Sequence, residues 1–535
     1  MGRVYDYAIK NGTVIDGTGT PGYPATVYVL GDKIAEISFG TDHPSQKVID
    51  ASGLAVAPGF MDIHTHSDTS PYCGPGFESA VSQGVTFHMI GNCGNSLVPN
   101  NGKNHDRLMR SKSAKFTHPI TGKDYHAFDA VSYCKEVSDR GIAINLGILA
   151  GHNAIRECVM EDPSCPEPSA REMEEMCALA EEMLCQGAMG LSLGLTYFPG
   201  VCARTEELTA LAKVAKKYDV PVAVHMRSET GSGTLEALRE MEQVALGSGA
   251  HIHISHLKVM YPHKEGAAAE VLGYIDDMRR RGIHITCDQY PYTATSTQLN
   301  LLPAWAKKKG TSACLDLLCD ESGFEKLQPG IKEEILRRRG AAAIQIANTR
   351  GAAPALDGKT LEEAAVALGK TAEEVFRELF IACQGELGVI YHAMEEADLL
   401  AILGRPDIGV GSDGWGYDMV SRGVAGMPHP RAMGTFPRAL RLIRDHDLMP
   451  IEEAVRKITG LPAELMKIES RGILRPGNFA DITVFDPKTV TDRATFTEPA
   501  LPSEGIYHVF VNGEPAYYNG TYLNRRAGHV LLQQR

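Results

Sequence analysis

Eight short apolar runs recur along the middle of the chain, separated by segments with a helical pattern. The runs, all between residues 59 and 414, are GFMDIHTH, GVTFHMIG, IAINLGILAGH, GAMGLSLGL, VPVAVHMR, HIHISHLK, HITCDQYPY and DIGVGSDG. Near-continuous apolar strands are typical of a parallel sheet that is covered on both faces. Helix-like segments such as residues 171–184 and 205–219 lie between several of the runs. Eight repeats of strand and helix predict an α/β fold built on a TIM-type (β/α)8 barrel.

The two ends of the chain carry a different pattern, of short strands and tight turns. Residues 1–57 contain turn sequences such as Asn11-Gly12, and residues 468–535 contain the strand-like ADITVFDP and IYHVFVNG with a turn at Asn512-Gly513. Asn-Gly between apolar runs is a strong hairpin signal. We therefore predict a small β-sandwich domain that is formed by both termini, beside a barrel domain at 58–467.

One segment breaks the alternation of strands and helices. Between the seventh and eighth apolar runs, from about residue 300 to about residue 400, the chain is too long for a single crossover helix. It contains the stretches LLPAWAKKKG, CLDLLCDESGFEKL and the helix-like KEEILRRRG. We predict an insertion before the last barrel strand. In barrel enzymes such an insertion often shapes or covers the site.

The composition excludes several classes of partner. A formal net charge of -13 over 535 residues, without a dense Lys/Arg cluster, argues against a nucleic-acid surface. Neither a signal-peptide pattern nor an apolar stretch of about 18 residues is present, so no membrane association is expected. Twelve cysteines without a C-x-x-C pair indicate reduced thiols in a cytoplasmic protein. The sequence carries no signal of the oligomeric state.

Polar residues of one chemical kind follow the apolar runs. Histidine, cysteine and aspartate stand at or near the carboxyl ends of six runs, as His64, His66, Cys93, His152, His225, His256 and Asp413. Barrel enzymes place their sites at this rim of the strands. His64 and His66 are two residues apart, so in a strand both would point to one side and reach one metal ion. A single histidine at a strand end is usually structural, but so many together predict a metal site.

Imidazole and thiolate ligands together indicate zinc. Three protein ligands plus a water is the catalytic pattern, and it lowers the pKa of the water to about 7. Asp413 is the natural general base beside such a site. Taken alone, the Ser-Asp-Gly sequence around Asp413 fits a simple turn as well as it fits a catalytic residue. Taken with the histidines, it favours a catalytic role for Asp413.

At this point the chain resembles a known family. The segments PGFMDIHTHSD, GNCG, GLSLGLTYFPG, HMRSE, ISHLK, DQYPYTA, GSDG and HPRAMGTFPRAL resemble the N-acyl-D-amino-acid deacylase (D-aminoacylase) family of the amidohydrolase superfamily, and RPGNFADITVFDP extends the likeness to the tail. The resemblance implies one tight zinc, a second weaker or vacant site, and a catalytic aspartate. The tight zinc would be held by Cys93, His225 and His256, the second site by His64 and His66, and the aspartate would be Asp413.

Cys93 also separates this chain from related enzymes. Many binuclear amidohydrolases, including hydantoinase-like enzymes, bridge their metals with a carboxylated lysine on the fourth strand. The fourth run here, GAMGLSLGL, has no lysine. We expect Cys93 to bridge the two metal positions instead.

The resemblance also implies how a substrate carboxylate is held. The predicted substrate contacts are Lys258, Tyr292, Arg227, Ser296 and His152. Lys258 and Arg227 each lie two residues past a predicted ligand, on its side of the chain if the strand continues. An ion pair of Arg227 with Glu229 or Asp288 is as good an interpretation as substrate contact. His152 has no role beyond lining the site.

These residues predict the zinc-dependent hydrolysis of small N-acyl-D-amino acids to a carboxylate and a free D-amino acid. The stretch STQLNLLPAW carries no basic residue, which favours a neutral or apolar D-side chain over glutamate. The alternative activity is that of another metal-dependent C–N hydrolase, acting on cyclic amides or dipeptide-like substrates. A non-enzymatic binding barrel is a third interpretation, and the complete ligand set argues against it.

Overall fold

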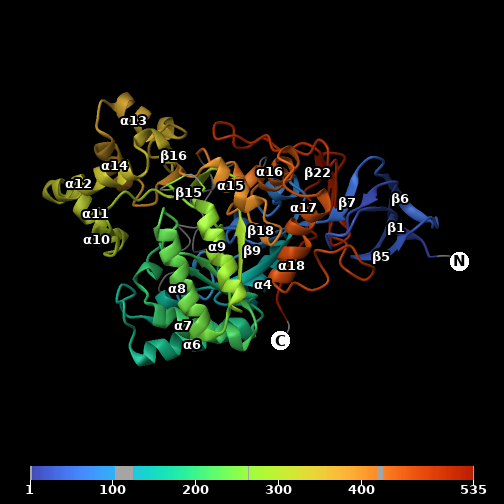
Figure 1. The fold of residues 1–535 in the computed structure, drawn as a ribbon, viewed down its shortest axis with the longest axis horizontal. Helices are drawn as coiled ribbons and strands as arrows, with labels where there is room; N and C mark the ends of the chain where they lie inside the picture. Colours follow the sequence, from blue (N-terminus) through green and yellow to red (C-terminus); the bar gives the residue numbers. More distant parts are fainter. Residues whose placement is uncertain (1–2, 103–124, 263, 265, 419–425, 534–535) are drawn as a thin grey trace.

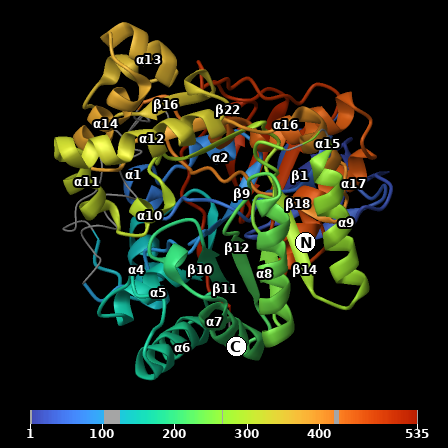
Figure 2. The same ribbon diagram turned by 60° about the vertical axis from the view of Figure 1, so that its left-hand side comes forward.

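Eight parallel strands surround the centre of the molecule (Figures 1 and 2). The computed structural model describes residues 3–102, 125–262, 264, 266–418 and 426–533. The strands are hydrogen-bonded to one another in chain order: β8 (Phe60–Asp62), β9 (Val85–Ile90), β10 (Asn145–Gly151), β11 (Gly190–Gly194), β12 (Pro221–His225), β13 (His251–Ile254), β14 (Ile285–Gln289) and β18 (Ile408–Val410). Each lies within one of the eight predicted apolar runs, so the predicted barrel is confirmed.

The barrel nearly closes where its first and last strands end. Thr65 and Gly414 form a parallel bridge just beyond β8 and β18. The His66 amide donates to the Gly414 carbonyl at 2.7 Å, and the Asp413 amide donates to the His64 carbonyl at 2.8 Å. Closure therefore joins two predicted site residues, His64 and Asp413, directly through the backbone, and it holds His66 beside them.

Helices cover the outside of the barrel, and Figure 2 shows α6 to α9 around strands β10 to β12. In α6, a capping box between Ser169 and Glu172 closes the first turn, and the apolar residues of one face are buried. None of the helices in the described ranges is long and apolar enough to cross a bilayer. The helices of the barrel and its rim are α1 (Ser70–Cys73), α2 (Glu78–Val81), α4 (Ala130–Arg140), α5 (His152–Val159), α6 (Ala170–Cys185), η1 (Gly200–Cys202), α7 (Thr205–Lys217), α8 (Gly233–Ser248), α9 (Ala267–Arg280), α15 (Glu396–Leu403), α16 (Arg431–Asp445), α17 (Ile451–Ile458) and α18 (Gly460–Leu465).

Both termini contribute strands to sheets at one end of the molecule, where the blue strands of Figure 1 lie. One sheet has the order β5-β4-β1-β6 and the other the order β22-β21-β20-β19-β7-β2-β3. Their strands are β1 (Tyr5–Lys10), β2 (Thr13–Val14), β3 (Tyr23–Pro24), β4 (Thr26–Leu30), β5 (Lys33–Ser38), β6 (Ser45–Asp50), β7 (Ala55–Pro58), β19 (Ile482–Phe485), β20 (Ile506–Val511), β21 (Glu514–Tyr518) and β22 (Thr521–Tyr522). Val27 and Val29 of the first sheet share one core with Ile482 and Val484 of the second. The domain boundaries at 57 and 468 stay a prediction.

The C-terminal segment also contacts the barrel directly. After the last sheet strand, β23 (Val530–Leu531) pairs in parallel with the first residues of β10. The barrel therefore carries a strand from the end of the chain at the start of its third strand.

Asp481 joins the terminal sheets to the barrel. Its buried carboxylate forms an ion pair with Arg471 and accepts the Asn512 amide at 2.8 Å. It also accepts from the Asn145 side chain, at the start of β10, at 3.3 Å. The Asp481 carbonyl accepts the Gly59 amide, just before β8, at 2.9 Å. One residue thus connects three parts of the chain that are far apart in sequence.

The predicted insertion before the last barrel strand is confirmed. A three-stranded antiparallel sheet of order β15-β17-β16 stands between β14 and β18, and its helices lie at the end of the molecule opposite the blue strands (Figure 1). The insertion has a hydrophobic cluster of its own, separate from that of the barrel. Its elements are β15 (Ala294–Gln298), α10 (Ala304–Lys307), α11 (Thr311–Cys319), α12 (Glu321–Arg337), η2 (Ala341–Ala343), β16 (Ile344–Asn348), η3 (Pro354–Leu356), α13 (Leu361–Leu368), α14 (Ala372–Ala382) and β17 (Gly388–His392).

Replacing Asp481 by Asn tests the connection between the sheets and the barrel. The change leaves the buried Arg471 guanidinium without its counterion, which costs about 3–5 kcal/mol. We expect a clearly lower midpoint of chemical unfolding. Asp139→Asn is the matched control, because Asp139 pairs with Lys135 on the surface, where such pairs contribute about 0–1 kcal/mol. Equal midpoints for the two variants would contradict this role of Asp481.

Candidate metal centre

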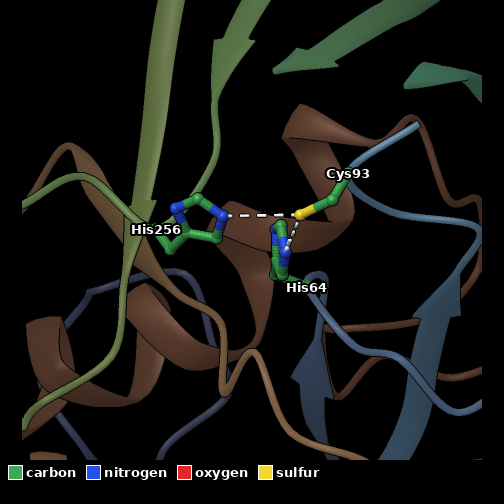
Figure 3. Close-up of side chains that lie close together, drawn as sticks. All are labelled: His64, Cys93 and His256. Atoms are coloured by element: carbon green, nitrogen blue, oxygen red, sulfur yellow. Dashed lines mark hydrogen bonds between the residues drawn. The ribbon is translucent and has the colours of Figure 1, made fainter. Parts of the chain in front are cut away.

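A buried thiol lies among three imidazoles at the carboxyl-terminal rim of the barrel. The Cys93 sulfur is 3.4 Å from His64 Nε2, 3.4 Å from His256 Nε2 and 3.6 Å from His225 Nδ1. All four side chains are buried. Figure 3 shows the rings of His64 and His256 directed at the sulfur from two different segments, those that follow β8 and β13. The structure thus brings together four of the five predicted metal ligands.

Strained backbone holds several of these residues in place. Cys93, His256 and Asp413 have φ angles of 55°, 40° and 53°, in the left-handed region that side chains other than glycine rarely adopt. Each such residue costs about 1–3 kcal/mol and persists only where its surroundings impose it. The His256 amide donates to the Asp288 carboxylate at 2.7 Å, and the Asp413 amide is held by His64. The strain coincides with the predicted site.

The loop that carries Cys93 lies against the end of the fourth strand. A Cβ atom on Gly194 would be 1.9 Å from the Cys93 carbonyl oxygen, so no side chain fits there. The Gly94 amide donates to the Ser192 hydroxyl at 3.0 Å. Cys93 therefore occupies the space beside the fourth strand, the strand that has no lysine.

His66 and Asp413 form a second group beside the thiol. Asp413 Oδ1 lies 3.0 Å from His66 Nε2 and 3.7 Å from His64 Nε2. Its other oxygen lies 2.8 Å from the Arg431 guanidinium. Burial alone would raise the pKa of Asp413, but Arg431 and His66 outweigh burial and hold it well below its usual value. Asp413 is therefore a carboxylate at neutral pH.

The surroundings also favour ionisation of the thiol. Burial alone would raise the pKa of Cys93, but the imidazoles of His64 and His256 hold it well below its usual value. A thiolate is the form that binds zinc. In a tetrahedral zinc site, sulfur and nitrogen ligand atoms are about 3.5 Å apart. The observed separations of 3.4 to 3.6 Å fit that spacing.

Two buried carboxylates stand behind the imidazoles. Glu229 Oε1 is 2.9 Å from His256 Nδ1, and Asp288 Oδ2 is 3.7 Å from His64 Nδ1. Asp288 also accepts from His253 Nε2 at 2.8 Å, if that nitrogen carries the proton. Burial would raise the pKa of Glu229, but Lys258 and the two histidines lower it to about 2. The positive groups of the site are thus matched by negative ones.

Of the predicted substrate contacts, Lys258 lies at the centre. Its ammonium nitrogen is 2.7 Å from Glu229 Oε1, 2.7 Å from His256 Nδ1 and 3.0 Å from the His256 carbonyl. Ser296 lies in β15 of the insertion, and its carbonyl accepts from Arg431 at 3.2 Å. The insertion thus borders the site, as predicted.

Two predicted contacts are engaged elsewhere. Arg227 donates to Glu240 and to the carbonyls of Val201 and Ala203, so its predicted ion pair with Glu229 or Asp288 is wrong. The reason is that β12 ends at His225, and the chain turns before Arg227. His152 Nε2 lies 2.6 Å from Glu207, which also pairs with Arg156.

The two tyrosines of DQYPYTA have different surroundings. The Tyr292 hydroxyl donates to the Pro430 carbonyl at 3.4 Å, and its ring packs against His429. Tyr290 lies between Lys258 and Arg431, at 5.4 and 5.0 Å from its ring centre. Its hydroxyl is buried and makes no hydrogen bond within the described residues. Tyr290 therefore lies between two cations beside the candidate site.

Glu229 is another residue beside the candidate site that the sequence pattern did not assign to it. The available signal was its position four residues after His225 in HMRSE, a carboxylate beside a predicted ligand. Sequence spacing predicts the direction of a side chain only within a regular strand, and β12 ends at His225.

Comparisons with known proteins agree with this geometry. The amidohydrolase family matches residues 47–517 of the chain. A D-aminoacylase from Alcaligenes xylosoxydans xylosoxydans is 34% identical over 530 residues, 99% of this chain and 98% of that protein. An N-acyl-D-glutamate deacylase from Bordetella bronchiseptica, solved with zinc and a phosphonate mimic of the tetrahedral intermediate, is 32% identical with a TM-score of 0.82, covering 99% of this chain and 100% of that chain.

A solved structure of D-aminoacylase, an enzyme with a binuclear metal centre, gives the same picture. It has a TM-score of 0.82 and 33% identity, and covers 99% of this chain and 100% of that chain. The resemblance that the motifs indicated is thereby confirmed. The chain belongs to the amidohydrolase family and, within it, to the N-acyl-D-amino-acid deacylases (D-aminoacylases).

Proposed function

We propose that this protein is a zinc-dependent hydrolase that cleaves N-acyl-D-amino acids to a carboxylate and a free D-amino acid. The observation that carries the proposal is the buried Cys93 thiol among three imidazoles, with the Asp413 carboxylate beside them. The two solved relatives, one with zinc and one with a binuclear metal centre, support the same chemistry. Twelve cysteines without a C-x-x-C pair support a reducing, cytoplasmic location.

Cys93, His225 and His256 are the ligands we propose for the tight zinc. His64 and His66, with Asp413 close to both, would hold a second and weaker ion that shares Cys93. The second ligand group reaches closer to water, since the His66 side chain is 25% exposed, whereas those of His225 and His256 in the tight group are 10% and 1% exposed. Water near an exposed ligand weakens the attraction between the ligand and the ion. The second ion is therefore bound less tightly.

Asp413 is the proposed general base. When bound, zinc supplies a Lewis acid for the amide carbonyl and lowers the pKa of water to about 7. The Asp413 carboxylate takes a proton from the attacking water, and the same proton then passes to the amine nitrogen as the C–N bond breaks. Arg431 and His66 hold the carboxylate in one orientation for both transfers.

The substrate carboxylate is proposed to lie near Tyr290, between two cations. Lys258 and Arg431 flank the Tyr290 ring, and its buried hydroxyl makes no hydrogen bond within the described residues. These three groups can hold an anion while the amide faces the metal ligands. Ser296 borders this space through its backbone. Tyr292, Arg227 and His152 hold surrounding segments in this proposal, since their polar atoms contact other groups.

A panel of substrates tests the proposal. We expect zinc-loaded protein to release free amine from N-acetyl-D-methionine or N-acetyl-D-leucine faster than from N-acetyl-D-glutamate, because STQLNLLPAW offers no basic residue to a second carboxylate. The L-forms, hydantoin and dihydrouracil serve as comparisons. Activity confined to the cyclic amides would overturn the proposed function.

The variant Asp413→Asn separates proton transfer from metal binding. The amide cannot act as a base, so kcat should fall by about 10²- to 10⁴-fold. The tight zinc should remain bound, because Cys93, His225 and His256 are unchanged. Zinc content is measured by atomic absorption, and Asp139→Asn serves as the control. Near-normal turnover by the Asp413 variant would defeat the mechanism.

Replacing two proposed ligands separates the two metal positions. Losing a group that is hydrogen-bonded to a metal ligand raises the metal dissociation constant roughly 10- to 100-fold. Cys93→Ser should raise the zinc dissociation constant by more than this, because Ser does not supply a thiolate. His66→Asn should keep the tight zinc and weaken only the second ion. Titration with a chromophoric chelator measures the dissociation constants of the tight and the weaker ion separately. Unchanged tight binding in the Cys93 variant would refute the assignment.

A further inference from the structure

Each imidazole that faces the Cys93 thiol also faces a carboxylate on its other side. For two of them the carboxylate belongs to the same residue, Glu229. Oε1 of Glu229 is 2.9 Å from His256 Nδ1, and Oε2 is 3.6 Å from His225 Nε2. The opposite nitrogens of these rings, His256 Nε2 and His225 Nδ1, are the ones that face the sulfur. One carboxylate therefore stands behind both rings.

The two histidines must adopt opposite tautomers to bind one metal. A neutral imidazole binds a metal through the nitrogen that carries no proton, and its other nitrogen then donates a hydrogen bond. His256 would bind through Nε2 and carry its proton on Nδ1, whereas His225 would bind through Nδ1 and carry its proton on Nε2. A carboxylate has two oxygens and accepts hydrogen bonds at both. Glu229 Oε1 lies within hydrogen-bond distance of His256 Nδ1, and Oε2 faces His225 Nε2 at 3.6 Å, a contact that is electrostatic and longer than a hydrogen bond.

We propose that Glu229 is a positioning residue that fixes the ring orientation and the tautomer of both His225 and His256. The inference rests on the proposed zinc site. It assigns to one buried side chain a task that metal sites usually divide among separate partners, one for each histidine.

The backbone holds Glu229 firmly enough for this role. The Glu229 carbonyl accepts the Met260 amide at 2.7 Å, and Thr230 forms a parallel bridge with Met260. The loop after β12 is thereby joined to the loop after β13, the two loops that carry or follow the ligands. Glu229 is 6% exposed, so its hydrogen bonds compete little with water.

Counting donors connects Glu229 to Lys258. The Lys258 ammonium has three N–H donors, and three acceptor atoms lie within 3.0 Å of it: Glu229 Oε1, the His256 carbonyl and His256 Nδ1. Once His256 Nδ1 carries a proton and donates to Glu229, it no longer accepts from Lys258. One ammonium donor is then left for the substrate carboxylate. In this proposal Glu229 thus determines which nitrogen of His256 carries the proton and leaves one Lys258 N–H group for the substrate.

Direct metal binding by Glu229 is the competing interpretation, because His225, Glu229 and His256 also lie close enough to hold an ion. The Lys258 ammonium argues against it. That cation lies 2.7 Å from Glu229 Oε1 and already occupies the position beside the carboxylate. A second cation there would meet like-charge repulsion in buried surroundings.

The isosteric variant Glu229→Gln provides the test. Glutamine keeps one acceptor oxygen, but its NH2 group faces the second imidazole N–H, so one ring loses its acceptor or is forced into the wrong tautomer. We expect the dissociation constant of the tight zinc to rise about 10- to 100-fold, measured by chelator competition on the full-length protein. The absorption spectrum of the cobalt-substituted protein should change as well. Glu242→Gln is the matched control, since Glu242 pairs with Arg281 away from the cluster.

A double variant distinguishes positioning from charge balance. Glu229→Gln leaves the Lys258 ammonium without its counterion, and this alone destabilises a buried pair. Glu229→Gln with Lys258→Met removes both charges. If Glu229 positions the imidazoles, the double variant folds but its zinc affinity stays reduced. Recovery of wild-type zinc affinity would show that Glu229 only neutralises Lys258 and would overturn the inference.

The outcome is independent of the proposed substrate. Wild-type protein that binds zinc tightly but releases no amine from any N-acyl-D-amino acid would contradict the proposed function, while the zinc affinities of the variants would still test Glu229. An unchanged zinc dissociation constant in both variants would overturn the inference whatever the activity.

Discussion

The contact of three imidazoles with the buried Cys93 thiol is the interaction on which the rim of the barrel depends. Four polar side chains in one dry volume are costly unless their charges and hydrogen bonds are matched. Here negative and positive groups alternate outward from the thiol. The imidazoles surround the sulfur, and the carboxylates Glu229, Asp288 and Asp413 stand behind or beside them. Lys258 and Arg431 complete the balance.

This arrangement explains why strained backbone gathers at the rim. A regular strand would direct side chains to alternate faces, and a loop in ordinary conformation would not aim four of them at one point. The left-handed conformations at Cys93, His256 and Asp413 redirect the chain where each ligand or base is needed. The nearly closed barrel offsets this cost, because the segments after its first and last strands are joined through the backbone, His64 to Asp413 and His66 to Gly414. Rigid strands thus support a strained site.

The remaining parts of the molecule stabilise or border this centre. Asp481 connects the terminal sheets to the start of β8 and of β10, so both ends of the chain support the barrel. The insertion contributes β15, whose Ser296 carbonyl contacts Arg431 beside Asp413. One border of the candidate site therefore belongs to the segment that least resembles a barrel repeat.

The sequence by itself determined the barrel, its eight strands, the insertion before the last strand and the five residues proposed to bind metal. It could do so because apolar runs and the polar residues that end them are local patterns, and the family motifs span most of the chain. Only the tertiary structure decided which neighbours those residues have. Arg227 contacts Glu240, Tyr290 rather than Tyr292 lies between the cations, and Glu229 stands behind two histidines. Once a strand ends, the direction of each following side chain depends on loop conformation and on segments distant in sequence, which no local pattern contains.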